Sequence, residues 1–485
     1  MSLPKYSSLQ QYQHNLAFHR KSSYTGPQYA MWSCVFCFTI LCLCPMRTDC
    51  FLNTTKQKVL LVLVDGFRWD SFGLDLPSLR RFENDGVRAD WLNSVFVSYL
   101  TPCAYSMTTG LYPESHGVIH YLYFNETTHT STTRFEDVFN ITEFFDTGVE
   151  PLWVTAKLAG KKVASVMWMG TAVPIKGIMS DRVIYHSYYR WSYKNYSMTA
   201  RVKDAVSWLA EEDFDLALVY LDQPDWVLHE NRIETERAQS AFWEVDETLN
   251  ALLDEADRRG LWDTLNVIIT SDHGHVNVDP KKYIILTDYI DEEDIDFSVM
   301  YGSVLFQLTP KGGAKDKVLR ALQSAHPALY VYSKEEFPEH FHYANHPRNL
   351  PIIGYVEVGW HVHMHPFDPS KDSLHSQSDH GYDPFSMEMR AIFYARGPAF
   401  KNNYRARALE MVDIYPMVCD ILNVEAAPNN GSRERYVSMM KETQDNNWNN
   451  TRLLLVTISL AAVVYFAINF CLPPKRVTTK SKKAD

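Results

Sequence analysis

Acidic and imidazole side chains follow apolar runs of this chain in a recurring pattern. Leu265–Thr270 is one such run, and directly after it come Ser271, Asp272, His273 and Gly274. The run predicts a buried parallel strand because it is apolar on both faces. Ligands gather at the carboxyl ends of strands in open α/β sheets. A carboxylate and an imidazole at that place are a common pair of zinc ligands, although a helix N-cap explains Asp272 alone equally well.

The same residue types occur at three further places. The apolar run Lys58–Val64 ends at Asp65. Another apolar run leads to Asp225 and His229, which lie four residues apart and share one face if that turn is helical. His380 lies in a histidine-rich loop. Three carboxylates and three imidazoles are enough for two neighbouring zinc ions, and two metals about 4 Å apart stabilise the attacking and leaving oxygens of phosphoryl transfer.

The elements that must position these side chains alternate between strands and helices. Glu234–Arg258 is amphipathic and predicts a long helix. A second helix is expected to start near Thr101, with Pro102 at an early position and Gly110 near its end. Residues 283–360 form a mixed segment without a clear pattern. The alternation predicts an α/β fold in which helices cover a mostly parallel sheet.

Composition limits the classes of protein to consider. The chain has 485 residues, enough for a large α/β domain, and its 46% hydrophobic and 22% charged residues indicate a globular protein. The net charge of -11 and the lack of a basic stripe in the central region argue against a nucleic-acid partner.

Two apolar segments lie near the ends of the chain. Residues 31–45 have the length of a signal-peptide core, with an uncleaved signal anchor as the alternative. Residues 453–472 carry no charge and span about 30 Å as a helix, which matches a bilayer core. The basic residues that follow predict a cytosolic C-terminus. The expected organisation is a leader at residues 1–50 and an ectodomain at residues 56–435. A stalk at residues 436–452, a membrane helix at residues 453–472 and a basic cytosolic tail at residues 473–485 follow.

This organisation predicts a single-pass type I protein of the plasma membrane, with an extracellular, N-glycosylated ectodomain. Glycosylation sequons support the placement, and they begin at Asn53, Asn125, Asn140, Asn195, Asn430 and Asn449. Cysteines are few in the ectodomain. A single bridge, for example between Cys103 and Cys419, is one of the pairings that the sequence leaves open.

The motifs together resemble those of the ecto-nucleotide pyrophosphatase/phosphodiesterases, within the alkaline-phosphatase superfamily, over roughly Lys58–Tyr436. The similar stretches are Val64–Arg68, Thr109–Gly117, Pro224–Asp225 with His229, Ser271–Gly274 and His380–Asp383. Glu335–Asn345 is most similar to the alkaline sphingomyelinase branch, which releases phosphocholine from lipids. The resemblance implies an alkaline-phosphatase-like fold and a zinc-dependent phosphodiesterase site, with a phosphodiester or phosphocholine lipid as substrate or ligand.

The resemblance also implies a ligand set for two zinc ions. One ion is held by Asp225, His229 and His380, and the other by Asp65, Asp272, His273 and the nucleophile. The chain departs from the family at three places. The nucleophile position holds Leu100, and an aliphatic side chain neither attacks phosphorus nor binds zinc. The family has an asparagine that steadies the phosphate oxygen, and this position holds Tyr121 here. The family also has a glycine before the metal-binding histidine, and this position holds Leu228.

Impaired catalysis in a zinc-bound domain that binds phosphate-bearing ligands is therefore the first expectation. An active phosphodiesterase that uses Thr101 is an alternative, although moving a helix start by one residue turns the side chain by about 100°. Attack by zinc-bound hydroxide is another. A non-catalytic cell-surface binding protein that keeps zinc for folding is the third. Tyr121 and Trp226 are expected near the ligand, either as pocket walls or core or stacked on a choline cation.

Overall fold

The computed structural model describes residues 56–185, 196–300, 302–366 and 376–441, and in addition residues 457, 458 and 460. The predicted leader, most of the stalk, nearly all of the membrane segment and the basic tail lie outside the described residues. Among the residues that are described, no helix is both long and apolar enough to cross a bilayer. The membrane helix therefore stays a prediction.

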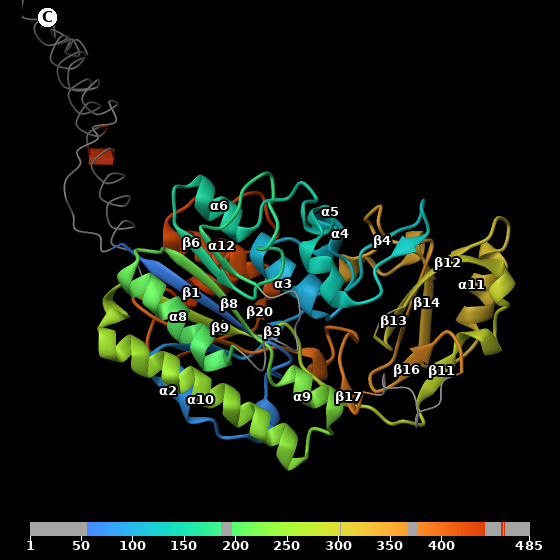
Figure 1. Cartoon of the computed structure of the whole chain (residues 1–485), viewed down its shortest axis with the longest axis horizontal. Helices are drawn as coiled ribbons and strands as arrows, with labels where there is room; N and C mark the ends of the chain where they lie inside the picture. The colour runs from blue at the N-terminus through green and yellow to red at the C-terminus, as the bar shows by residue number, and fades with distance from the viewer. Residues whose placement is uncertain are drawn as a thin grey trace, which may run out of the picture. The chain divides into compact units, whose positions relative to one another are not determined.

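A mixed eight-stranded sheet forms the centre of the described chain (Figure 1). Its central strand β1 (Lys58–Val64) pairs in parallel with β8 (Leu216–Leu221) and with β9 (Leu265–Thr270). β18 (Phe393–Arg396) runs antiparallel to β9. The remaining strands are β19 (Tyr404–Ala406), β2 (Val87–Ala89), β6 (Val163–Val166) and β7 (Arg182–Ile184). The predicted α/β fold with a mostly parallel sheet is confirmed.

Helices cover both faces of this sheet, so its central strands are buried on both sides (Figure 1). The helices of one face are α2 (Pro77–Asp85), α8 (Met198–Glu211) and α10 (Glu236–Arg259). The helices of the other face are α3 (Leu100–Thr109), α6 (Leu152–Leu158) and α12 (Ile414–Leu422). This packing explains why the three central strands are apolar at successive positions rather than at every second one.

Two helices that the sequence predicts have clear boundary residues. α10 starts after Thr235, whose side chain accepts a hydrogen bond from the Ala238 amide, and it ends at Gly260 in the left-handed conformation. α3 begins at Leu100, one residue earlier than the predicted Thr101. It ends at Gly110, which is left-handed with a φ of 66°.

Residues 283–360, which the sequence left as a mixed segment, contain a second sheet with a core of its own. Its antiparallel strands, in spatial order, are β12 (Ile295–Met300), β13 (Leu305–Pro310), β15 (Ile352–Val356) and β14 (Leu329–Ser333). Helix α11 (Lys315–Gln323) packs against it. The Glu335–Asn345 stretch buries Phe337, Phe341 and Tyr343 in an aromatic cluster around Phe96.

Several short elements complete the described chain. The strands are β3 (Leu92–Asn93), β4 (Phe124–Asn125), β5 (Thr130–Ser131), β10 (Val276–Asn277), β11 (Tyr283–Ile285), β16 (His361–His363), β17 (Ser378–Asp379) and β20 (Leu409–Glu410). The helices are α4 (Pro113–His116), α5 (Thr142–Phe145), α9 (Asp225–Glu230) and α13 (Arg433–Tyr436). β10 pairs antiparallel with β17, and this ladder joins the chain after β9 to the histidine-rich loop.

The two ectodomain cysteines in the described chain are not bridged. Cys103 and Cys419 are both buried free thiols. The pairing that the sequence left open between them is therefore wrong.

A buried ion pair supports the turn that leads to α9. Arg201 Nη1 lies 2.7 Å from Asp222 Oδ1, and the side chains are 0% and 1% exposed. Replacing Arg201 with methionine is expected to lower the free energy of unfolding by about 3–5 kcal/mol, because the Asp222 carboxylate stays buried without its cation. The midpoint of urea unfolding measures this.

The matched control is Arg80→Met, since the Arg80–Asp75 pair is 57% and 71% exposed. Its expected cost is about 0–1 kcal/mol. Equal midpoints for the two variants would contradict the prediction.

Candidate metal centre

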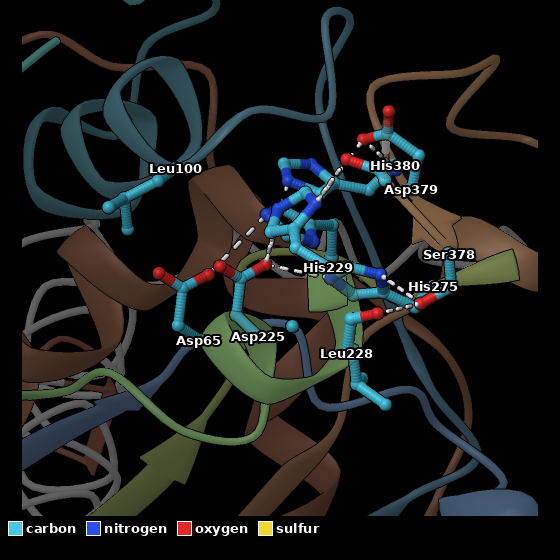
Figure 2. Close-up of polar contacts among 12 residues, drawn as sticks. Asp65, Leu100, Asp225, Leu228, His229, His275, Ser378, Asp379 and His380 are labelled. Atoms are coloured by element: carbon cyan, nitrogen blue, oxygen red, sulfur yellow. Dashed lines mark hydrogen bonds and ion pairs between the residues drawn. The ribbon is translucent and has the colours of Figure 1, made fainter. Parts of the chain in front are cut away.

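Acidic and imidazole side chains converge where β1, β8 and β9 end (Figure 2). Asp65 directly follows β1, α9 follows β8, and the Asp272–His275 stretch follows β9. The side chains form two groups, and within each group the ligand atoms lie within 4.8 Å of one another. The three-residue group is Asp65, Asp272 and His273, and the four-residue group is Asp225, His229, His275 and His380. The structure thus brings together all six residues that were predicted as ligands, and His275 lies with them.

The three-residue group leaves three atoms directed at one another. His273 Nε2 lies 3.5 Å from Asp65 Oδ1 and 3.3 Å from Asp272 Oδ2. These three atoms are buried and form no hydrogen bond with the described residues. Buried carboxylate oxygens rarely lack a partner, so this cluster fits a bound cation.

The other atoms of the same side chains are held in place. Asp272 Oδ1 accepts hydrogen bonds from the Gly66 and His273 amides, both at 3.0 Å. The Tyr220 hydroxyl donates to Asp65 Oδ2. His273 Nδ1 lies 3.1 Å from the Gly274 carbonyl, which orients the ring so that Nε2 presents its lone pair.

The four-residue group is arranged around one oxygen. Asp225 Oδ1 lies 3.5 Å from Nε2 of His229, 3.5 Å from Nε2 of His380 and 2.7 Å from Nε2 of His275. The Nδ1 atom of each ring contacts a serine. His229 Nδ1 lies 3.0 Å from Ser376 Oγ, and His275 Nδ1 lies 3.3 Å from Ser378 Oγ. His380 Nδ1 lies 2.9 Å from the Ser98 carbonyl. Every ring thus has one nitrogen held by a neighbour and the other directed at the group, which is the usual arrangement of metal-binding histidines.

The electrostatics of the site favour a cation. Burial raises the pKa of Asp65, and the charges of Asp225 and Asp272 raise it further. Burial lowers the pKa of His273 to about 3 and also lowers that of His380. Burial has the same effect on His229, but the charge of Asp225 outweighs it and raises the pKa of His229 to about 9. Neutral imidazoles and ionised carboxylates are the forms that bind metal.

Gly66 permits the close approach of two of these side chains. Its φ is +70°, and a Cβ added there would lie 2.9 Å from both Asp225 Cβ and His275 Cδ2. A side chain at this position would push α9 away from the end of β1. Glycine is therefore needed both for its backbone conformation and for space.

Leu100 lies where a nucleophile was expected. It is the first residue of α3 and is 3% exposed. Figure 2 shows it on the Asp65 side of the cluster. Burial raises the pKa of Cys103, in the first turn of the same helix, and the charges of Asp272 and Asp65 raise it further. The first residue of α3, on the Asp65 side of the cluster, is therefore aliphatic.

The remaining predicted residues lie in different surroundings. The Thr101 hydroxyl is buried and has no hydrogen-bond partner among the described residues. The Tyr121 hydroxyl lies 3.4 Å from the Leu100 amide and 3.5 Å from His380 Nε2, so it reaches the site. Trp226 is half-buried and packs against the main core. Leu228 is buried, and its carbonyl accepts a hydrogen bond from Ser378.

His275 is the residue that the sequence reasoning missed. It lies two positions after His273, and the only sequence signal is a second imidazole beside the Asp272–His273 pair. Gly274, between the two histidines, packs against the chain near residue 388, since an added Cβ would lie 2.1 Å from the Glu388 carbonyl. The β10–β17 ladder then brings His275 next to His380.

Comparison with known proteins identifies the family. The type I phosphodiesterase / nucleotide pyrophosphatase family matches residues 59–383. The chain belongs to this family. Mouse ectonucleotide pyrophosphatase/phosphodiesterase family member 7 is 34% identical over 387 residues, which cover 78% of this chain and 86% of the relative. Human family member 5 is 33% identical over 397 residues, covering 81% of this chain and 80% of the relative.

Other members of the family have different names and known structures. The mouse bis(5'-adenosyl)-triphosphatase enpp4 is 34% identical over 387 residues, covering 78% of this chain and 80% of the relative. The structure of murine ectonucleotide pyrophosphatase/phosphodiesterase 5 is similar with a TM-score of 0.73 at 31% identity, covering 79% of this chain and 100% of that chain. The alkaline-phosphatase-like fold and the predicted family are thus confirmed.

Proposed function

We propose that this family member binds two zinc ions and is a catalytically impaired phosphodiesterase, acting at the cell surface as a binding protein for phosphodiesters or phosphocholine-bearing lipids. The observation that carries the proposal is Leu100, which lies at the start of α3 beside an otherwise complete set of metal ligands.

The ligand set supports zinc as the metal. Both groups combine imidazole nitrogens with carboxylate oxygens, and this mixture suits zinc better than magnesium or calcium, which prefer oxygen ligands alone. The unpaired buried atoms of Asp65, Asp272 and His273 support occupation of the three-residue group.

Two features weaken phosphate chemistry at this centre. Leu100 has no oxygen that could attack phosphorus. The amide of Leu100 donates to the Tyr121 hydroxyl, so the first amide of α3 is directed at a protein oxygen. Amides at a helix N-terminus are otherwise well suited to hold a phosphate oxygen.

The class of ligand is proposed from similarity. The Glu335–Asn345 stretch resembles the alkaline sphingomyelinase branch, which favours a phosphocholine lipid. An adenine nucleotide is the alternative, because one relative is named a bis(5'-adenosyl)-triphosphatase and an inactive form of murine member 5 is known in complex with AMP. The extracellular location and the membrane helix at 453–472 remain proposals based on sequence.

Turnover by the purified full-length protein, loaded with zinc, tests the proposal. Hydrolysis of p-nitrophenyl-phosphocholine and of sphingomyelin is expected to stay close to the buffer rate, while calorimetric titration detects binding of phosphocholine. Rapid hydrolysis by the unmodified chain would contradict impaired catalysis.

Two variants separate the alternatives if hydrolysis is rapid. Activity abolished by Thr101→Ala would identify Thr101 as the nucleophile, which its buried, unpaired hydroxyl favours. Activity that survives Thr101→Ala but is lost in Asp272→Asn would indicate direct attack by water at the metal centre.

A further inference from the structure

Three imidazole rings of the four-residue group surround Asp225 at nearly equal spacing. The ring centroids of His229 and His275 are 5.1 Å apart, those of His275 and His380 are 5.0 Å apart, and those of His229 and His380 are 5.1 Å apart. Imidazoles bound through one nitrogen at ~2.0–2.1 Å to a tetrahedral zinc have ring centres about 5 Å apart. The spacing of all three rings therefore suits a single metal ion.

Rigid neighbours fix His275 in this position. Val276 pairs with Asp379 in the β10–β17 ladder, so His275 and His380 lie at the same end of that ladder. His275 is fully buried, and its Nδ1 contacts Ser378 Oγ. Its ring also packs against Gly66, where a side chain would collide with it. Its Nε2 is thus held 2.7 Å from Asp225 Oδ1, the same oxygen that the Nε2 atoms of His229 and His380 approach to 3.5 Å.

We infer that His275 is a fourth protein ligand, and that Asp225, His229, His275 and His380 form a closed metal site. This inference rests on the proposed function, because it assumes that the centre binds zinc. Structural zinc sites have four protein ligands, whereas catalytic sites have three and keep the fourth position open for water or substrate. With His275 bound, no position remains for a substrate oxygen at this metal.

The two departures at the centre then act in the same direction. Leu100 removes the reacting group beside the three-residue group, and His275 closes the four-residue group. Phosphoryl transfer at a two-metal site needs both metals to contact the reacting phosphate. The closed site therefore serves folding and the support of α9.

A competing role for His275 is that it only orients Asp225 through the 2.7 Å contact of Nε2 with Oδ1. In that case three protein ligands would leave one position open. The response of the bound metal to added phosphate distinguishes the two roles, because an open position accepts the anion and a closed one does not.

The test uses cobalt, which replaces zinc and absorbs visible light. The full-length Asp272→Asn variant is loaded with one equivalent of Co²⁺, because asparagine removes a charged ligand from the three-residue group while keeping its shape. Inorganic phosphate is then added and the visible spectrum is recorded. We expect the intense bands of a tetrahedral site and no change on addition of phosphate.

The double variant Asp272→Asn with His275→Gln is tested in the same way, because it lacks the proposed fourth ligand. Its spectrum is expected to shift when phosphate is added, and its Co²⁺ affinity to fall about 100-fold or more, because a direct ligand is lost rather than a supporting residue. His326→Gln is the control, since His326 lies by Trp360, in the region of the second sheet, and belongs to neither group.

The outcomes are distinguishable. A phosphate-dependent shift while His275 is intact would overturn the inference but leave metal binding, and with it the proposed function, in place. This measurement does not depend on whether the His275→Gln chain folds. Failure of the chain to bind cobalt or zinc at all would overturn both.

Discussion

Replacing Leu100 with threonine in the His275→Gln background, at saturating zinc, is expected to raise the rate of p-nitrophenyl-phosphocholine hydrolysis by about 10²-fold or more. The variant places a hydroxyl at the start of α3, on the Asp65 side of the cluster. Leu100→Thr alone is expected to raise the rate much less, because His275 still closes the four-residue group. Steady-state assays of the full-length protein measure both effects.

Leu100→Val is the matched control for this experiment. Valine has nearly the shape of threonine and is branched at the same carbon, but it lacks the hydroxyl. In the same background its rate is expected to equal that of His275→Gln alone. If the threonine and valine variants hydrolysed the substrate equally slowly, the absence of a nucleophile would not be what limits turnover.

Removal of the metal is expected to have the second large effect. Each site that is occupied at 1,000 times its dissociation constant adds about 4 kcal/mol to the free energy of unfolding. Without the ions, the buried carboxylates of Asp65, Asp225 and Asp272 repel one another. Urea unfolding of the zinc-loaded protein and of the protein after dialysis against a chelator measures the loss.

Asp272→Asn serves as the comparison for metal removal. Its response to the chelator is expected to be smaller, because one site is already weakened. Identical unfolding midpoints with and without chelator in the unmodified chain would mean that the centre holds no metal. If the chelator lowers the stability of the protein and the protein has no measurable turnover, this result would support the alternative that zinc serves folding only.

The residues of the metal centre that follow strands could be predicted, because the sequence pattern of a buried strand is local. Runs that are apolar at every position identify buried strands, so Asp65 and Asp272 could be placed at strand ends from neighbouring residues alone. The four-residue spacing of Asp225 and His229 likewise describes one turn of α9.

His275 could not be found in this way, because its position depends on a contact between distant parts of the chain. Only the pairing of Val276 with Asp379 brings it beside His380. The second sheet escaped prediction for a similar reason. Its strands are short and pair with partners that the order of the sequence does not reveal, such as β13 with β15.

The predicted start of α3, Thr101, differs from the observed start, Leu100, by a single residue. Pro102 is compatible with an early position in either register, so the sequence could not choose between Leu100 and Thr101 as the first helical residue. The state of Cys103 and Cys419 was equally beyond the sequence, because residue spacing does not say whether two buried thiols approach closely enough to bond.

The position of β1 in the middle of its sheet has a consequence for synthesis of the protein. Val59 pairs with Leu216 on one side and with Asn266 on the other. While the ribosome is still adding these later residues, the nascent strand has neither neighbour, and its apolar side chains remain open to association with other chains. Pairing between residues so far apart in the sequence slows folding, so chaperones are expected to hold this strand until β8 and β9 have been made.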